Sequence, residues 1–369
     1  MKIITSPLAP GHNNSKSKVR SLKSGAFMTG TLLAVLFMFA LSASISVQAQ
    51  TTEAWASASD NYTNGPLGGD WNPAITDSLT NWPDNFNGSA SSSAGYVVVI
   101  TNSGTCDYAP VPAGDPDYTN TIEDLILGSP GNGAGGGGVA NTFNMSGGAL
   151  TLADPNGPAF AIGGVATGGK LGSQCTNFFT MTGGLLIATN ALANGNGGCV
   201  VGFQTNNTAT VNFNGGTAIL SDLVVGGHGA AVVNINGGNV ILLGTDTNGI
   251  RAISFDTQAK GSGTLNLISG TLTMTNSEID LGHGAIAGLT SVLNVSGGTL
   301  NVPRIQYSTG SAAKATNIVN LSGGTINFGS SGYGRNGATA TNQFIMSGGT
   351  ISCLPGNSPT LSSLIPTIL

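Results

Sequence analysis

Few side chains in this chain could catalyse a reaction or hold a metal ion. Its 369 residues include 16 acidic residues, 11 basic residues and 3 histidines, so charged residues make up 7% of the sequence. Hydrolysis of a glycoside needs two carboxylates about 5 to 9.5 Å apart, and a lyase needs a base beside cation-bound carboxylates. In the long C-terminal part of the chain, the carboxylates available for such chemistry are Asp154, Asp222, Asp246, Asp256, Glu278 and Asp280.

Two of these carboxylates occupy equivalent places in a repeated sequence pattern. Asp222 and Glu278 each follow a serine and precede an apolar residue, but they lie two repeats apart, a separation of roughly 10 Å if the repeats stack as neighbouring strands. Arg251 and Arg304 fall near the same place in the intervening and following repeats. We interpret these four residues as a charge ladder on the surface, where each pair contributes about 0 to 1 kcal/mol. We predict no catalytic residues; a carbohydrate-active enzyme remains the alternative.

The histidines and glycine-rich strings give no stronger signal of chemistry. His228 and His283 stand in the similar strings VVGGHGA and IDLGHGA, and we interpret both as exposed turn residues. No C-x-x-C or G-x-S-x-G occurs, aspartates do not recur with the period of a calcium repeat, and the glycine strings do not lie between a strand and a helix. The sequence therefore predicts no cofactor and no metal site.

The elements that would hold these residues belong to a repeat. One eight-residue phrase recurs at intervals of 22 to 36 residues: FNMSGGAL, FTMTGGLL, VNFNGGTA, VNINGGNV, LNLISGTL, LNVSGGTL, VNLSGGTI and FIMSGGTI, which begin at Phe143, Phe179, Val211, Val233, Leu265, Leu293, Val319 and Phe344. Self-similarity at a period of about 20 to 50 residues is typical of solenoids, propellers and arrays.

The alternation inside each phrase predicts strands. Apolar residues alternate with polar ones before the glycine pair and again after it, and a third short apolar run ends near another glycine, as in VVGG at Val224. Three short strands and three turns predict one coil of a single-stranded, right-handed parallel β-helix, with about eight or more coils in all. The inward columns should then be Phe143, Val211, Val233, Leu265, Leu293 and Val319, followed by Met145, Phe213, Ile235, Leu267, Val295 and Leu321.

Two polar columns should lie on the outside of these coils. One holds Asn144, Asn212, Asn234, Asn266, Asn294 and Asn320, and the other holds Thr217, Thr271, Thr299, Thr325 and Thr350. Stacked identical side chains can hydrogen-bond from strand to strand, which is our interpretation of both columns. A flat face that binds glycan or ice is the alternative.

The first 49 residues read as a secretory signal peptide. They combine five basic residues and no acidic ones, an apolar run from Thr31 to Leu41, and small residues with Val47-Gln48-Ala49 as a processing site. The apolar run is shorter than the ~20 residues of a spanning helix, although an uncleaved anchor remains open. We expect a secreted or outer-surface protein with no membrane span in the mature chain.

Residues 50–140 differ from the repeat of residues 141–353 and from the tail of residues 354–369. They hold all three tryptophans, and we interpret them as an N-terminal cap with the first coils. The alternative is an aromatic platform on which Trp71 and Trp82 contact sugar rings. Export permits disulfides, and Cys175 and Cys199, which are 24 residues apart, could fall on neighbouring coils and form one.

The phrases VNLSGGTI, LNVSGGTL and LNLISGTL, together with the Trp-rich stretch DWNPAITDSLTNW, resemble exported bacterial β-strand-repeat proteins of the autotransporter-associated repeat type. The resemblance implies the pectin-lyase-like β-helix class and no fixed catalytic residues. With so few basic residues, the composition disfavours nucleic acid as a partner. We therefore expect a non-catalytic structural or adhesion protein, with extracellular polysaccharide or cell-surface glycans as candidate partners. The alternatives are a polysaccharide lyase or hydrolase and a glycan-binding module.

Overall fold

The computed structural model describes residues 51–54, 69–71, 96–100, 105–108, 119–122, 124–128, 140–153, 158–164, 174–189, 198–244, 251–256, 261–275, 277–283, 289–307, 316–335 and 341–355. The chain divides into two compact units, Met1–Gln48 and Ala49–Leu369, and all described residues belong to the second. The predicted signal peptide therefore lies outside the described residues.

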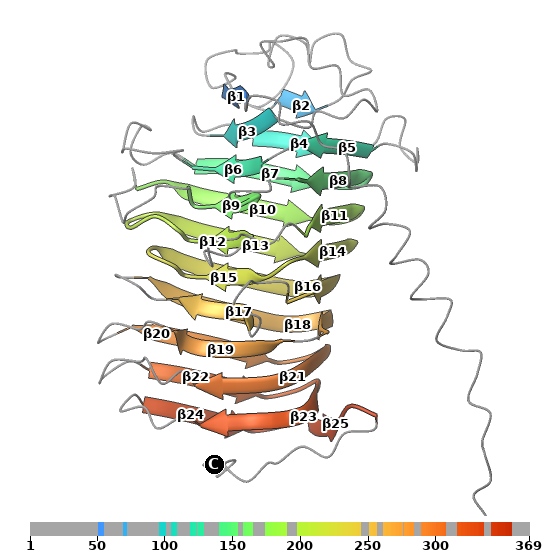
Figure 1. Ribbon diagram of the computed structural model, residues 1–369, viewed down its shortest axis with the longest axis vertical. Coiled ribbons are helices and arrows are strands. Elements are labelled where there is room, and N and C mark those ends of the chain that lie inside the picture. The colour runs from blue at the N-terminus through green and yellow to red at the C-terminus, as the bar shows by residue number, and fades with distance from the viewer. Residues whose placement is uncertain are drawn as a thin grey trace, which may run out of the picture. The chain divides into compact units, whose positions relative to one another are not determined.

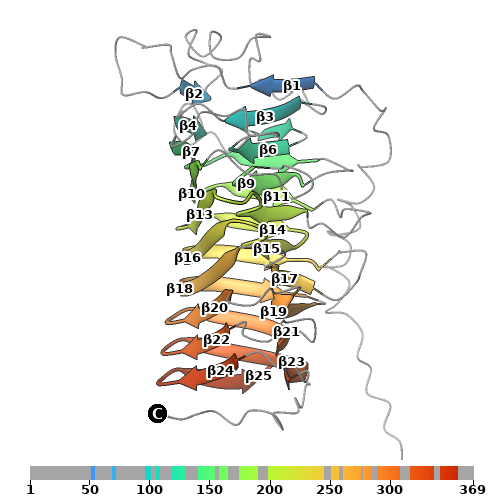
Figure 2. The same ribbon diagram turned by 90° about the vertical axis from the view of Figure 1, so that its left-hand side faces the viewer.

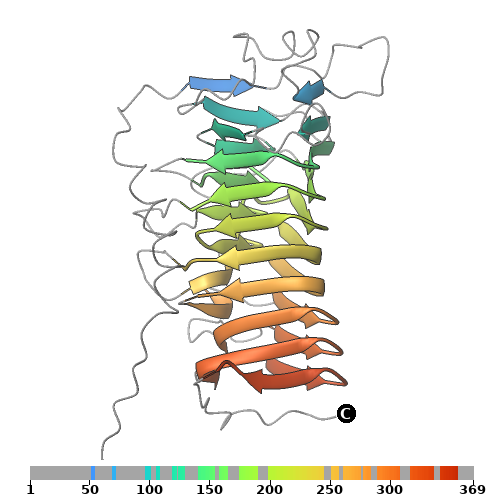
Figure 3. The same cartoon turned by 90° about the vertical axis from the view of Figure 1, so that its right-hand side faces the viewer.

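The described part of the chain is all-β: it contains strands and no helix. Its strands pair in parallel, as in β7 with β10 and β10 with β13. Figure 1 shows the strands stacked in the order of the sequence, and Figures 2 and 3 show the same stacking from two opposite sides. The predicted all-β fold with parallel strands is confirmed, and the arrangement is compatible with a β-helix or solenoid.

The parallel pairings form three ladders, which we call faces 1, 2 and 3. Face 1 consists of β2 (Gly69–Trp71), β4 (Thr105–Tyr108), β7 (Ala140–Met145), β10 (Thr176–Met181), β13 (Thr208–Phe213), the first parts of β16 (Ala230–Leu242) and β18 (Ser262–Met274), β20 (Thr290–Val295), β22 (Thr316–Leu321) and β24 (Thr341–Met346).

Face 2 follows face 1 along the chain in each repeat. It consists of β5 (Thr119–Ile122), β8 (Ala149–Leu152), β11 (Leu185–Ala188), β14 (Thr217–Leu220), the later parts of β16 and β18, the first parts of β21 (Thr299–Tyr307) and β23 (Thr325–Arg335), and β25 (Thr350–Cys353).

Face 3 completes each repeat before the chain returns to face 1. It consists of β1 (Thr51–Ala54), β3 (Tyr96–Ile100), β6 (Asp124–Leu127), β9 (Phe160–Ile162), β12 (Cys199–Val201), β15 (Leu223–Val225), β17 (Arg251–Asp256), β19 (Glu278–His283) and the later parts of β21 and β23.

The register of face 1 equals the spacing of the repeated phrase. Ala140 pairs with Thr176 and Thr176 with Thr208, so equivalent residues of the phrase become direct neighbours on adjacent strands. Both predicted inward columns are at most 1% exposed, which confirms them as core. Aromatic rings continue from strand to strand within this core: the rings of Phe143 and Phe179 stack with their centroids 5.7 Å apart.

The glycine pairs form the turns between faces 1 and 2, where one coil lies tightly on the next. The second glycine usually takes a positive φ, for example +84° at Gly184, which an L side chain rarely adopts. A Cβ on the first glycine would also meet the preceding turn: at Gly183 it would lie 2.5 Å from the Ser146 carbonyl oxygen. The turns therefore need glycine for two separate reasons.

Candidate functional site

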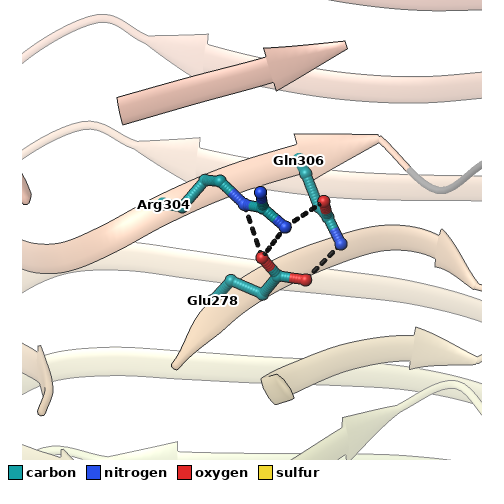
Figure 4. Close-up of polar contacts among 3 residues, drawn as sticks. All are labelled: Glu278, Arg304 and Gln306. Carbon is teal, nitrogen blue, oxygen red and sulfur yellow. Dashed lines mark hydrogen bonds and ion pairs between the residues drawn. The ribbon is translucent and has the colours of Figure 1, made fainter. Parts of the chain in front are cut away.

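The most strongly charged cluster among the described residues lies on the outer side of face 3, where β19 and β21 are adjacent. Glu278 begins β19, and its register partner on β21 is Arg304. The Arg304 Nε donates a hydrogen bond to Glu278 Oε2 at 2.5 Å, and its guanidinium also forms an ion pair with that oxygen. Figure 4 shows Gln306 completing the group: it bonds to the Glu278 carboxylate and accepts from Arg304 at 2.5 Å.

This cluster is largely withdrawn from solvent. Glu278 is 4% exposed and Gln306 is 8% exposed, whereas the Arg304 side chain keeps 33% of its surface exposed. A buried carboxylate is stable when its charge is paired and its oxygens are hydrogen-bonded, and Arg304 and Gln306 together supply both. The group therefore ties β19 to β21 through charge as well as through the backbone ladder.

The predicted charge ladder is correct in part. Arg251 pairs in register with Glu278, and Glu278 with Arg304, so these three positions do follow one another along face 3. The prediction of surface pairs is wrong for Glu278, which is buried together with the outward side chains beside it, Asp280 and Gln306. The side chains of Arg251 and Asp256 and all of Asp154 and Asp246 lie outside the described residues.

Asp222, the fourth residue of the predicted ladder, is also buried and not at the surface. It is 6% exposed, and its Oδ1 accepts hydrogen bonds from the backbone N–H groups of Gly198 (2.6 Å) and Cys199 (3.2 Å) on the preceding strand. The Ser221 hydroxyl donates to the same oxygen at 3.1 Å. The carboxylate thus binds the start of the neighbouring strand β12, and these hydrogen bonds hold two coils together.

Cys199 is a buried thiol, and the predicted disulfide with Cys175 is not formed. The two cysteines do not fall on neighbouring coils, because 24 residues is less than one repeat at this point. Cys175 immediately precedes β10 on face 1, and Cys199 lies on face 3 of the same repeat. Burial, and then the nearby Asp222 charge, raise the pKa of the Cys199 thiol. Its Sγ donates weakly to the Ala188 carbonyl oxygen at 3.8 Å.

Of the two histidines predicted to lie in exposed turns, only His228 has a described side chain. His228 follows β15, is half-buried rather than fully exposed, and its ring meets the Phe203 ring edge-on at a centroid distance of 5.5 Å. Burial lowers the pKa of His228. His283 ends β19 and pairs in register with Asp256, but neither side chain is described. The described residues contain no group of three or more His, Cys, Asp or Glu side chains that could hold a metal ion.

The alternative role of Trp71 and Trp82, contact with glycan, is not tested by the described residues. Trp82 lies outside the described residues, and for Trp71 only the backbone is described. That backbone pairs in register with Tyr108, whose side chain is fully buried and donates to the Ala149 carbonyl oxygen at 2.6 Å.

The predicted asparagine ladder on face 1 is confirmed from Asn212 to Asn320. Asn234, Asn266, Asn294 and Asn320 each donate from Nδ2 to the Oδ1 of the asparagine on the preceding coil, at 2.7 to 2.8 Å. Asn212 begins the series and donates to the Thr180 hydroxyl at 3.4 Å. A shorter series follows on face 2, where Asn327 donates to Asn301 and Asn301 to Thr273.

A second set of amides, not predicted from the sequence, lies inside the corner between faces 3 and 1. Asn141, Asn177 and Asn317 are completely buried. Asn141 donates to Asn177 at 2.8 Å, and Asn177 donates to the Thr208 carbonyl oxygen at 3.2 Å. These asparagines stand two residues before the first inward apolar residue of the phrase, as does Asn342, which accepts from Asn317 at 2.8 Å, whereas the other four coils have alanine, glycine or serine there.

Comparison with known proteins assigns no relative. No protein-family model matches the chain, no curated protein matches it, and no solved structure matches its fold. The described residues also include no helix of the length and hydropathy that a membrane span requires. The function must therefore be argued from the geometry above.

Proposed function

We propose that this chain is an exported, non-catalytic β-helical protein that serves a structural or adhesive role at the cell surface or outside the cell. The proposal includes a right-handed single-stranded helix of about eight or more coils, a cap within residues 50–140, and kinship with the autotransporter-associated repeat type. A stack of this kind buries its core only by repetition, so it makes a rigid extended scaffold.

The observation that supports a scaffold is that the polar side chains bond to one another between adjacent coils. The face 1 asparagines, the face 2 asparagines and the Glu278–Arg304–Gln306 group all bond to side chains on adjacent coils. Catalysis requires groups that converge on a substrate and are matched to it in the transition state. Here the hydrogen-bonding capacity is directed along the stack, where each bond contributes about 1 kcal/mol to stability.

One observation favours the competing function, a carbohydrate-active enzyme. Glu278 and Asp280 lie two residues apart on β19, so both point to its outer side. Their separation of about 6.6 to 7 Å along the strand falls in the range for an inverting glycosidase. Against this, Asp280 is 1% exposed and Glu278 is already bound by Arg304, so neither carboxylate is available to a polymer.

Export is the part of the proposal that can be tested first. The full chain and a Leu36→Arg variant, which places a charge in the apolar run, should be produced in the same bacterial host and the cells fractionated. We expect the wild-type protein outside the cytoplasm, with a new N-terminus near Gln50, and the variant retained inside. Wild-type protein that stays in the cytoplasm with residues 1–49 intact would overturn the proposal.

A further inference from the structure

The outer side of face 1 is uncharged over a long stretch of the stack. From β7 to β24 every outward position is described, and none is Asp, Glu, Lys or Arg. These positions form three columns: a small and hydroxyl column, a middle column of mostly threonine and β-branched residues, and the amide column. They are Ala140, Thr176, Thr208, Ala230, Ser262, Thr290, Thr316 and Thr341; Thr142, Phe178, Thr210, Val232, Thr264, Val292, Ile318 and Gln343; and Asn144, Thr180, Asn212, Asn234, Asn266, Asn294, Asn320 and Ile345.

The amide ladder fixes the orientation of the groups on this surface. A primary amide has two N–H donors and two acceptor lone pairs. In Asn234, Asn266 and Asn294 the ladder uses one donor and one lone pair, so one N–H and one lone pair of each remain on the solvent side. The rows repeat at the strand spacing of about 4.8 Å, which makes a regular array of oriented hydrogen-bonding groups.

Face 2 is not an equivalent surface. Its strands present only two outward positions each, and in the middle of the stack one of these two carries a half-buried apolar row, Ile187, Ile219 and Ile241. Face 3 carries the Glu278–Arg304 pair. Face 1 is therefore the broadest neutral, hydrogen-bonding surface among the described residues.

The chemistry of face 1 determines the kind of partner that fits. A charged partner would lose hydration on a surface that offers it no opposite charge, which is unfavourable. A polymer of neutral sugar rings matches better, because its hydroxyls can bond to the threonine and asparagine columns while its C–H faces lie on the methyl groups of the middle column. A rigid surface also loses little conformational entropy on binding.

We propose that the outer side of face 1, from β7 to β24, is the surface by which this protein binds a neutral polysaccharide. The inference rests on the proposed adhesive role and names its surface and partner class.

The test compares equal charge changes on two faces. Thr210→Lys/Thr264→Lys places two lysines in the middle column of face 1, and Thr299→Lys/Thr325→Lys places two on face 2, at positions that are likewise half-buried. Circular dichroism and thermal midpoints should first show that both full-length variants fold. Retention is then measured on microcrystalline cellulose, chitin and insoluble β-1,3-glucan, with polygalacturonate as the charged polymer.

We expect the wild-type protein to be retained on at least one neutral polymer and not on polygalacturonate. The face 1 variant should lose about tenfold or more in affinity, since unpaired charges become buried at the contact, and the face 2 variant should stay within about twofold. The inference would be overturned by equal losses of affinity in both variants, by binding to polygalacturonate alone, or by retention on no neutral polymer. Thermal hysteresis in ice, without binding to a polysaccharide, would also overturn it. An exported protein that binds no polymer would leave the proposed structural role standing.

Discussion

Face 1 and face 3 belong to the same coils but hold their outward polar side chains together by different means. Face 1 repeats one neutral hydrogen bond, asparagine to asparagine, over successive coils. Face 3 carries buried charged side chains, and between β19 and β21 Glu278 is paired with Arg304 and bonded to Gln306. A neutral ladder can be extended by any coil that supplies another asparagine, whereas the ion pair needs two particular neighbours. The asparagine ladder therefore suits a repeated surface, whereas the ion pair fixes the register between two particular strands, β19 and β21.

A substitution in the glycine turn between faces 1 and 2 should have the largest effect on stability, because successive turns are in close contact there. Gly184→Ala would place a Cβ 2.5 Å from the Gly148 carbonyl oxygen at a φ of +84°. We expect a loss of about 2 to 5 kcal/mol from overpacking and left-handed strain together, seen as a lower denaturation midpoint. Ser269→Ala, at the one turn without a first glycine, is the control and should change stability by less than about 1 kcal/mol. Similar losses in both would show that the turns are not tightly stacked.

Removing the charge on face 3 should have the next largest effect. Glu278→Ala leaves Arg304 without its carboxylate, and we expect a loss of about 1 to 3 kcal/mol, reduced from the fully buried case because Arg304 can rehydrate. Glu278→Gln keeps the shape of the side chain and removes only the charge. A double-mutant cycle with Arg304→Ala measures the coupling between the two side chains, and a coupling near zero would mean that the pair does not hold β19 to β21.

The asparagine ladder should show a dependence on position. Asn266→Ala removes two ladder bonds, to Asn234 and from Asn294, whereas Asn320→Ala removes one, because Ile345 occupies the next coil. At about 1 kcal/mol for each bond we expect losses near 2 and 1 kcal/mol. Equal losses at the two sites would argue that the amides contribute individually and not as a ladder.

The smallest expected effect is a pH dependence from His228. Burial lowers its pKa from 6.5, so the unfolded chain binds a proton more readily than the folded one as the pH falls below about 6.5. Stability should therefore be highest above that pH and decline toward acid, and His228→Gln should flatten the decline in denaturation midpoints measured between pH 7.5 and 5. An unchanged slope in the variant would assign the acid sensitivity to other groups.

The sequence was sufficient for the strands and most of the core because the repeat aligns equivalent residues. Phe143, Val211 and Leu265 share one place in the phrase, and all become buried neighbours along face 1. The same alignment predicted the asparagine ladder, since an outward amide at a constant position must meet its equivalent on the next coil.

Face 3 was harder to predict because its environment depends on more than alternation. The outward residue Val200 is 1% exposed, so alternation along β12 does not separate a buried side from a solvated one. For that reason Asp222 and Glu278 were expected at the surface and are buried. Gln306 was missed because its part in the charged group follows from the register between β19 and β21, which spacing alone does not give.

We propose a scaffold without catalysis, and the measurement that tests this proposal is the release of products from polysaccharides. The full chain should be incubated with neutral and acidic polysaccharides, and reducing ends and unsaturated products measured against a heat-denatured sample. We predict no release above that background from wild-type protein or from Glu278→Gln and Asp280→Asn. Release by the wild type that is abolished in either variant, while the Thr299→Lys/Thr325→Lys protein retains it, would contradict the account and make face 3 an active site.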